Sequence, residues 1–202
     1  MMIVRQIPVG AMQNFVYVLA DRRGGEALVV DSGWETGPIT RAAEELNVKV
    51  KYIVATHNHF DHTASLKHLA GELGAKVVVH ERSPIEHDLS VSDGDTLAIG
   101  REKVRVIYTP GHTQDSICLY DGGNLFTGDT LFIGNCGRTH LPGGSIEDMF
   151  RSLHDIILKL PMATMIFPGH DYGDVPSRKL GEEALSNPTL SARNYSEFLG
   201  VP

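Results

Sequence analysis

The chain has 202 residues, 42% of them hydrophobic, and a formal net charge of -7. This length suffices for one domain with a substantial core, and we expect a single domain over residues 1–202. The acidic balance argues against a nucleic-acid-binding protein, which would present a basic face. No stretch approaches the roughly 20 consecutive apolar residues that cross a bilayer, so we expect no membrane partner.

Runs with the periodicity of strands and helices alternate along the first half of the chain. Strands are predicted at residues 2–8, 14–20, 26–31, 52–55 and 76–80. Helices are predicted at residues 36–46 and 63–73. The strand at 26–31 is a short apolar run that stops at Ser32-Gly33, as a buried strand does.

The second half largely repeats this plan. Strands are predicted at residues 103–108, 116–120, 125–127 and 165–167. One helix is predicted at residues 145–160, with a capping box at Ser145, and a last helix begins near Arg178. Strands mixed with helices in two halves indicate an α/β protein with two packed sheets and helices outside them.

The cysteines and the N-terminus bear on the compartment. Cys118 and Cys136 form no CxxC pair, which excludes a zinc ribbon or a thioredoxin-type motif. Polar residues interrupt any apolar signal-peptide region near the N-terminus, among them Arg5 and Gln13. We therefore expect a reduced, cytoplasmic protein.

The segment His57-Asn58-His59-Phe60-Asp61-His62 directly follows the predicted strand at residues 52–55. Imidazole and carboxylate groups are ligands suited to zinc, iron or manganese. His57 and His59 are two residues apart and point to one side of an extended backbone. Asp61 and His62 follow the end of the strand and can face a second ion. The spacing suggests two metal positions.

Three later segments share one pattern, in which a strand-like run is followed by Pro or Gly and then by a metal-competent residue. These residues are His112, Asp129 and His170. Gly and Pro let the backbone turn sharply where a strand ends, and functional side chains are common in such loops. A buried, unpaired Asp61 or Asp129 would be costly without a cation, which favours a metal site.

Together these motifs resemble the metallo-β-lactamase superfamily. The resemblance implies an αββα sandwich of two mixed β-sheets with outer helices and the metals at one edge. It implies two divalent ions with Asp129 between them, one held by His57, His59 and His112 and the other by Asp61, His62 and His170. It also implies that Asp61 orients a metal-bound hydroxide, and the positive charge of the ions would stabilise an oxyanion.

Within the superfamily, residues 127–139 and 168–172 resemble the glyoxalase II and persulfide dioxygenase branch. That resemblance implies substrate contacts by Arg138, His140 and Tyr172, and Arg138 is suited to grip a carboxylate. The chain resembles a short form without the helical C-terminal domain of glyoxalase II. A neighbouring subunit of a homo-oligomer is one way to complete its pocket.

Other features resemble the persulfide dioxygenases more, namely Cys136-Gly-Arg-Thr139, Glu182-Glu183 and Asn187-Pro188. This second resemblance implies a single Fe(II), which His57, His112 and Asp129 of this chain would hold. Two ions and one ion are therefore alternatives, and zinc, iron and manganese all suit the ligands.

Three activities are compatible with these motifs. The first is a glyoxalase II-like hydrolase of a small-molecule thioester, for example one derived from glutathione. The second is a mono-iron dioxygenase of a persulfide. The third is a promiscuous metallohydrolase of lactones, β-lactams or phosphoesters. A metal-binding module without activity ranks last, because structural metal sites have no need of an open, glycine-rich mouth.

Two residues near the motifs have two interpretations each. Asp31 either supports the metal loop by hydrogen bonds or is a simple turn residue. Cys136 either approaches the pocket or, as we favour, is a buried and inert thiol.

Overall fold

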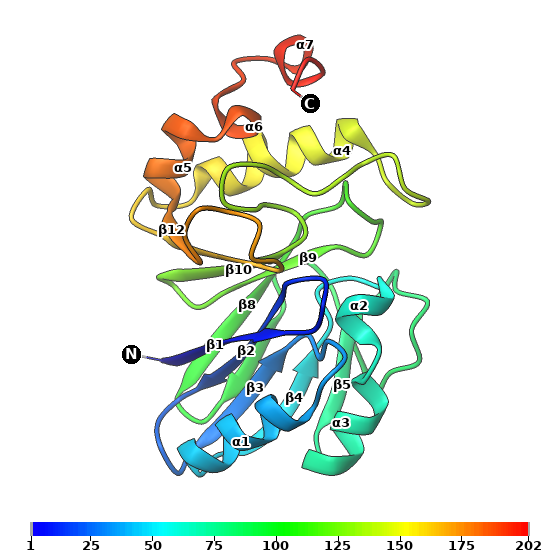
Figure 1. Cartoon of the computed structure of the whole chain (residues 1–202), viewed down its shortest axis with the longest axis vertical. Coiled ribbons are helices and arrows are strands. Elements are labelled where there is room, and N and C mark those ends of the chain that lie inside the picture. Colours follow the sequence, from blue (N-terminus) through cyan, green and yellow to red (C-terminus); the bar gives the residue numbers. More distant parts are fainter. Residues whose placement is uncertain (1, 202) are drawn as a thin grey trace.

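The N-terminal half of the chain builds the first sheet of the computed structural model, which describes residues 2–201 (Figure 1). Its six strands lie side by side in sequence order: β1 (Ile3–Val9), β2 (Asn14–Ala20), β3 (Glu26–Val30), β4 (Lys49–Val54), β5 (Lys76–His80) and β6 (Leu89–Val91). Strands β1 to β3 pair antiparallel and β3 to β6 pair parallel, so the sheet is mixed. The crossovers α1 (Gly37–Leu46) and α3 (Leu66–Leu73) cover its outer face.

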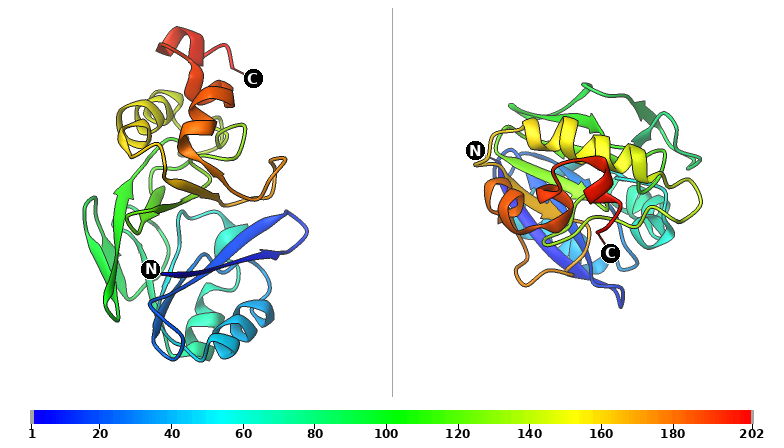
Figure 2. Two further views of the ribbon diagram at one scale, coloured as in Figure 1. Left: turned by 90° about the vertical axis from the view of Figure 1, so that its left-hand side faces the viewer. Right: turned by 90° about the horizontal axis from the view of Figure 1, so that it is seen from above.

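The second sheet comes from the rest of the chain. Its strands are β7 (Thr96–Ile99), β8 (Glu102–Tyr108), β9 (Ile117–Tyr120), β10 (Asn124–Gly128), β11 (Met165–Pro168) and β12 (Arg178–Lys179), which lie in the order β12-β11-β10-β9-β8-β7. Only the β10–β11 pair is parallel among these described strands. The helical segments α4 (Ile146–Arg151), α5 (Leu180–Ser186), α6 (Pro188–Ser191) and α7 (Tyr195–Phe198) lie on the outer side of this sheet (Figure 2).

Alternation along β2 shows how the layers form. Val16 and Val18 face the helices α1 and α3, whereas Tyr17 and Leu19 face the second sheet. All four are buried, as expected of a strand covered on both sides. Each such apolar side chain contributes about 1.5–3 kcal/mol by leaving water. A third apolar layer lies between the second sheet and the C-terminal helices. The predicted αββα sandwich is confirmed.

Several predicted elements differ in detail from the structure. The helix predicted at 145–160 begins as α4, with Ser145 capping Asp148, but continues as a π-helix (Ser152–Ile156) and a 3₁₀ turn (Ile157–Lys159). The helix predicted from Arg178 starts two residues later, because Arg178 pairs with β11 in a short strand.

Besides β12, two strands and one helix break were missed. Strands β6 and β7 have three and four residues, too few for a clear period-two pattern. The run at 63–73 is preceded by a separate short helix, α2 (Phe60–Thr63), which carries part of the histidine motif.

Backbone hydrogen bonds join the two sheets at the edge where the motif loops lie. Ile117 donates to the Thr56 carbonyl (2.9 Å), and Phe15 donates to the Gly169 carbonyl (2.8 Å). Tyr17 adds a side-chain hydrogen bond to the Pro168 carbonyl. These links bring loops from both halves of the chain to one place. Within residues 2–201, no helix has the length and apolar character to cross a membrane.

Candidate metal centre

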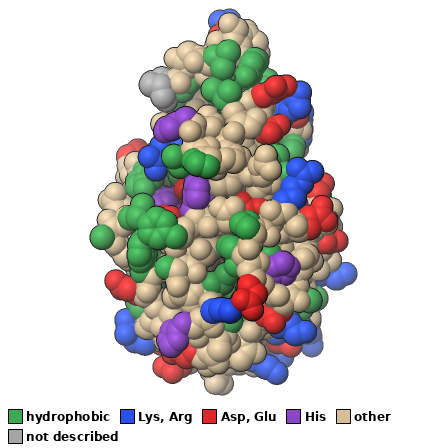
Figure 3. Space-filling view, turned by 90° about the vertical axis from the view of Figure 1, so that its right-hand side faces the viewer, with side chains coloured by type: hydrophobic (Ala, Val, Ile, Leu, Met, Phe, Trp, Pro, Cys, Tyr) green, Lys and Arg blue, Asp and Glu red, His purple; other side chains and the backbone are tan. Residues whose placement is uncertain are grey.

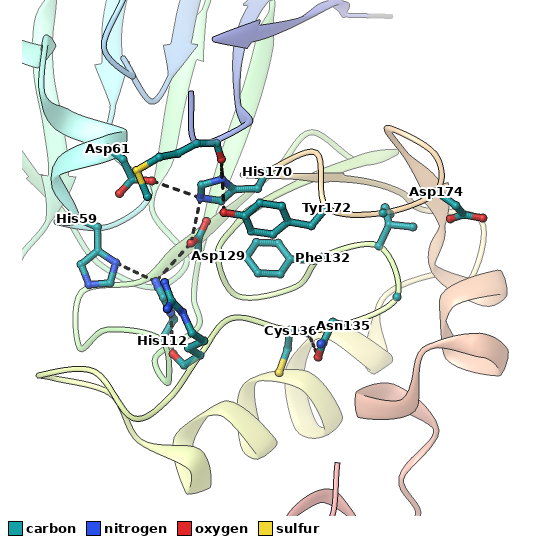
Figure 4. A pocket seen from close by; sticks show the side chains of 15 residues that line it. His59, Asp61, His112, Asp129, Phe132, Asn135, Cys136, His170, Tyr172 and Asp174 are labelled. Atoms are coloured by element: carbon teal, nitrogen blue, oxygen red, sulfur yellow. Dashed lines mark hydrogen bonds and ion pairs between the residues drawn. The ribbon is translucent and has the colours of Figure 1, made fainter. Parts of the chain in front are cut away.

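The predicted ligands come from loops that meet at this edge of the sandwich. They are His57 and His59 after β4, Asp61 and His62 in α2, His112 after β8, Asp129 after β10 and His170 after β11. All are buried except His59, which is half-buried. Figure 4 shows the side chains of His59, Asp61, His112, Asp129 and His170 directed toward a common centre.

One cluster contains three imidazoles. The ligand atoms of His57, His59 and His112 lie within 4.8 Å of one another. His112 Nε2 is 2.9 Å from His59 Nδ1. The Nε2 atom of His57 is buried and has no hydrogen-bond partner. The side-by-side arrangement that sequence spacing predicts for His57 and His59 is present.

A second cluster contains Asp61, His62 and His170. His62 Nε2 lies 3.1 Å from His170 Nε2 and 3.4 Å from Asp61 Oδ2. His170 Nε2 is also 3.4 Å from Asp61 Oδ2. These are the residues expected to surround the second ion.

Asp129 lies between the clusters. Its Oδ2 atom is 3.4 Å from the Nε2 atoms of His112 and His170, one from each cluster. Its Oδ1 atom lies 3.2 Å from His62 Nε2 but has no hydrogen-bond partner of acceptable geometry. The carboxylate therefore occupies the place expected of a ligand shared by two ions.

These residues fit a divalent metal. Ligand atoms bound at about 2.0–2.1 Å around one tetrahedral ion lie about 3.3 Å apart, close to the separations within and between the clusters. The buried atoms His57 Nε2 and Asp129 Oδ1 lack partners, at a cost of about 1–3 kcal/mol each unless a cation is present. Nitrogen and carboxylate donors suit zinc, iron and manganese alike.

The other ring nitrogens are held in a way that sets the tautomers. The Nδ1 atoms of His112 and His170 donate to the carbonyls of Arg138 (2.7 Å) and Met12 (2.8 Å). His62 Nδ1 donates to Asp31 Oδ2 (2.9 Å). A proton on Nδ1 leaves the Nε2 lone pair available for a metal, as partners of this kind do in metal sites.

Asp31 organises the histidine loop. Its carboxylate accepts hydrogen bonds from the Thr56 backbone nitrogen (2.7 Å), the Thr56 hydroxyl (2.9 Å) and His62. Since the hydroxyl proton of Thr56 is used there, its oxygen accepts from His57 Nδ1 at 3.1 Å. Asp31 has a φ of +60°, a conformation that Asp tolerates better than most residues. It therefore supports the loop and also forms its turn.

Asn14 was missed by the sequence analysis. Its amide nitrogen donates to Asp61 Oδ2 (2.9 Å), and the side chain is buried at the start of β2. A polar residue at the head of an otherwise apolar strand is the signal that could have identified it. Its role is to orient the Asp61 carboxylate.

Two glycines allow the ligand loops to approach their neighbours. A Cβ on Gly111, before His112, would lie 2.4 Å from the Met149 backbone. A Cβ on Gly128, before Asp129, would lie 2.5 Å from the Thr56 hydroxyl. Both residues also have positive φ angles, so only glycine fits without strain.

A cavity of about 710 Å³ opens in front of the metal centre. Arg138 and Tyr172 line it, as do Phe132 and Cys136, whereas His140 lines a smaller neighbouring cavity. The role of His140 in substrate binding stays a prediction from the sequence. Histidine side chains are visible between hydrophobic ones on the face in Figure 3. Cys136 is half-buried and lines the cavity, so the favoured interpretation of a buried thiol away from the pocket is wrong in its position. Burial raises the pKa of its thiol to about 11, so the thiol stays protonated at neutral pH.

The imidazoles of the two clusters differ in protonation. Burial lowers the pKa values of His57, His59 and His112. Burial acts in the same direction on His62 and His170, but nearby carboxylates outweigh it. They raise the pKa of His62 well above its usual value and that of His170 to about 9. The first cluster is thus neutral at pH 7, and the second carries protons when no metal is bound.

Comparison with known proteins agrees with the fold. Residues 9–170 match the family model described as the metallo-beta-lactamase superfamily. The chain is 35% identical over 193 residues to the human protein named persulfide dioxygenase ETHE1, mitochondrial, covering 93% of this chain and 76% of that protein. It is 38% identical over 187 residues to a hydroxyacylglutathione hydrolase of Cereibacter sphaeroides, covering 89% and 71%.

A solved structure extends this likeness to the whole chain. The crystal structure of ETHE1 from Myxococcus xanthus matches with a TM-score of 0.92 and 29% sequence identity. The match covers 100% of this chain and 92% of that one, so it includes the segment after His170.

The substitution Asp31→Ala tests the support given to His62. It removes the acceptor of His62 Nδ1, and we expect metal affinity to fall about 10–100-fold. Competition with a chromophoric chelator measures the affinity. Asp155→Ala, at an exposed position, is the control. Equal affinities in both variants would contradict the role assigned to Asp31.

The protonation difference predicts that acid displaces metal from the second cluster first. His170 must lose its proton to bind a metal, so affinity there falls as the pH drops below about 9. Burial lowers the pKa values of the imidazoles of the first cluster, so these keep their affinity for metal to a lower pH than the second cluster does. Metal content after dialysis of the zinc-loaded protein from pH 9 to pH 5 measures this. Parallel loss from both clusters would disprove the assignment.

Proposed function

Since this chain belongs to the metallo-beta-lactamase superfamily, we propose that it is a metal-dependent enzyme that oxygenates a small-molecule persulfide. The observation that carries this proposal is the likeness to ETHE1 over the whole chain, including residues 171–201. The 35% identity to human persulfide dioxygenase supports the same activity. Glutathione persulfide is the substrate we infer from the name of this relative together with that of hydroxyacylglutathione hydrolase.

The site provides ligands for the metal that this activity requires. One Fe(II) would be held by His57, His112 and Asp129, a set of two imidazoles and one carboxylate that leaves positions open. Held by these residues, the iron would supply the redox chemistry of the oxygenation. In this arrangement Asp61, His62 and His170 remain beside the site without holding a metal.

The chain's own residues bind and orient the substrate. Arg138 is exposed on the cavity wall and is the only Lys or Arg among the residues that line it. Its guanidinium can pair with a carboxylate of the thiol carrier. Tyr172 stacks on His170 with 4.5 Å between ring centroids and presents its other side to the cavity. The persulfide end would then point toward the ligand cluster.

Thioester hydrolysis is the second candidate function. It is favoured by the complete second cluster and by Asp129 between the two clusters, an arrangement that suits two ions. Asp61 is held by Asn14 and faces the cavity, where it can orient an attacking water. Burial by itself raises the pKa of Asp61. The hydrogen bond from His170 and the charge of His62 lower the pKa by more than burial raises it, so the carboxylate stays charged.

Activity and metal content separate the two functions. For the dioxygenase we expect about one iron per chain and oxygen uptake with glutathione persulfide. S-lactoylglutathione should be turned over at a negligible rate. Two metals per chain, with hydrolysis of S-lactoylglutathione and no oxygen uptake, would show that the hydrolase is correct.

The variant His170→Ala gives a second readout of the same question. A mono-iron enzyme loses less than about tenfold in kcat, whereas an enzyme with two metals loses about 100-fold or more. The control His57→Ala removes a ligand in both arrangements and should abolish activity in either case.

Arg138→Ala should weaken substrate binding more than turnover. We expect KM to rise at least about tenfold and kcat to change less than about threefold, because the lost contact lies away from the reacting atoms. Arg101→Ala, at an exposed position before β8, is the matched control. A fall in kcat with unchanged KM would contradict the role of Arg138.

A further inference from the structure

Glu183 is a fully buried carboxylate that has no role in the metal binding or substrate binding proposed for this site. It lies in α5, and both of its oxygens accept hydrogen bonds. Oε2 accepts from the Gly134 backbone nitrogen (2.8 Å) and from Asn187 Nδ2 (2.9 Å). Oε1 accepts from Arg178 Nη1 at 3.1 Å. A buried charge persists only with such partners, so this group has a specific structural task.

The partners of Glu183 hold one loop of the cavity wall. Gly134 belongs to the irregular segment 132–136, which lines the cavity. Asn187 Nδ2 also contacts the carbonyls of Phe132 (3.3 Å) and Asn135 (3.2 Å) in that segment. Backbone groups outside regular structure need such side-chain partners to keep one conformation.

The same network holds a second loop of the wall. Arg178 donates from Nη2 to both carboxylate oxygens of Asp174, each at 2.7 Å. Gly173 and Asp174 line the cavity three and four residues after His170. Arg178 therefore connects the buried Glu183 to the cavity rim.

The two loops also touch each other beside the ligands. A Cβ on Gly173 would lie 2.5 Å from Ile133 Cβ, so the backbones are in close contact. The Phe132 ring packs against Tyr172 and His170, with centroids 5.4 and 5.8 Å apart. Figure 4 shows Phe132 and Tyr172 side by side next to His170. A shift of segment 132–136 would move the surface that faces the substrate.

We propose that Glu183, with Arg178 and Asn187, is a positioning group that fixes the outer wall of the substrate cavity. It thereby sets the affinity for the thiol carrier of the substrate without touching it. The inference deepens the proposed function and rests on it for the identity of the substrate. It assigns to the C-terminal helical segment a part in substrate binding and none in holding the metal.

Hydrogen exchange and kinetics of the metal-loaded full chain test this role. Glu183→Ala removes all three hydrogen bonds. Glu183→Gln keeps an acceptor for Gly134 and Asn187 but loses the ion pair with Arg178. Glu182→Ala, the neighbouring exposed glutamate, is the matched control. KM and kcat are measured with whichever of glutathione persulfide and S-lactoylglutathione the wild-type protein turns over.

For Glu183→Ala we expect peptides covering residues 131–138 to exchange about tenfold faster, and KM to rise about tenfold. Metal content should stay unchanged and kcat should remain within about threefold. Glu183→Gln should loosen residues 171–178 only and give an intermediate KM. Glu182→Ala should match the wild type.

Unchanged exchange in both loops, or a loss of metal and kcat at constant KM, would overturn the proposal. If Glu183→Ala does not fold, Glu183→Gln decides by the exchange of residues 171–178. If neither substrate is turned over, the proposed function fails, while the exchange of the two loops still shows whether Glu183 holds the wall.

Discussion

The position of the Asp129 carboxylate is the constraint on which the rest of the site depends. It is buried between two sets of imidazoles and lies within 3.4 Å of a histidine from each. A charge in that environment is stable only when cations or protonated imidazoles surround it. The two sheets place it there, because the loop after β10 carries Asp129, while α2 and the loops after β4, β8 and β11 carry its histidine neighbours. The central apolar layer keeps these strands in register.

The fold surrounds this centre with groups that fix orientation. Asp31 and backbone carbonyls hold the far nitrogens of the imidazoles, and Asn14 holds Asp61. Each of these contacts joins segments far apart in sequence. The ligand geometry is therefore a property of the packed sandwich, and it would be lost if the sheets separated. A contact of the same kind joins Glu183 to Gly134 across the packed structure. Through it the C-terminal segment can shape the cavity although it carries none of the candidate ligands.

Much of the fold followed from the sequence because most strands are long enough to show their period. The short strands β6 and β7 did not, and the helix at 145–160 changes to a π-helix where Ser152 bonds to the Pro110 carbonyl. That contact crosses 42 residues of sequence, so no local pattern could report it. The candidate metal ligands could be read from the sequence because functional side chains are common in loops at strand ends.

The sequence by itself determined the types and the order of the candidate ligands and predicted the sandwich that carries them, since these depend on residue chemistry and local periodicity. The family resemblance had already implied the two candidate sets with Asp129 between them, and the tertiary structure brings these side chains together. Only the tertiary structure decided that His140 lines a smaller neighbouring cavity. It also placed Asn14 and Glu183 in their roles. The physical reason is that these relations depend on distances across the two sheets, which packing of the apolar layers sets and which no local spacing contains.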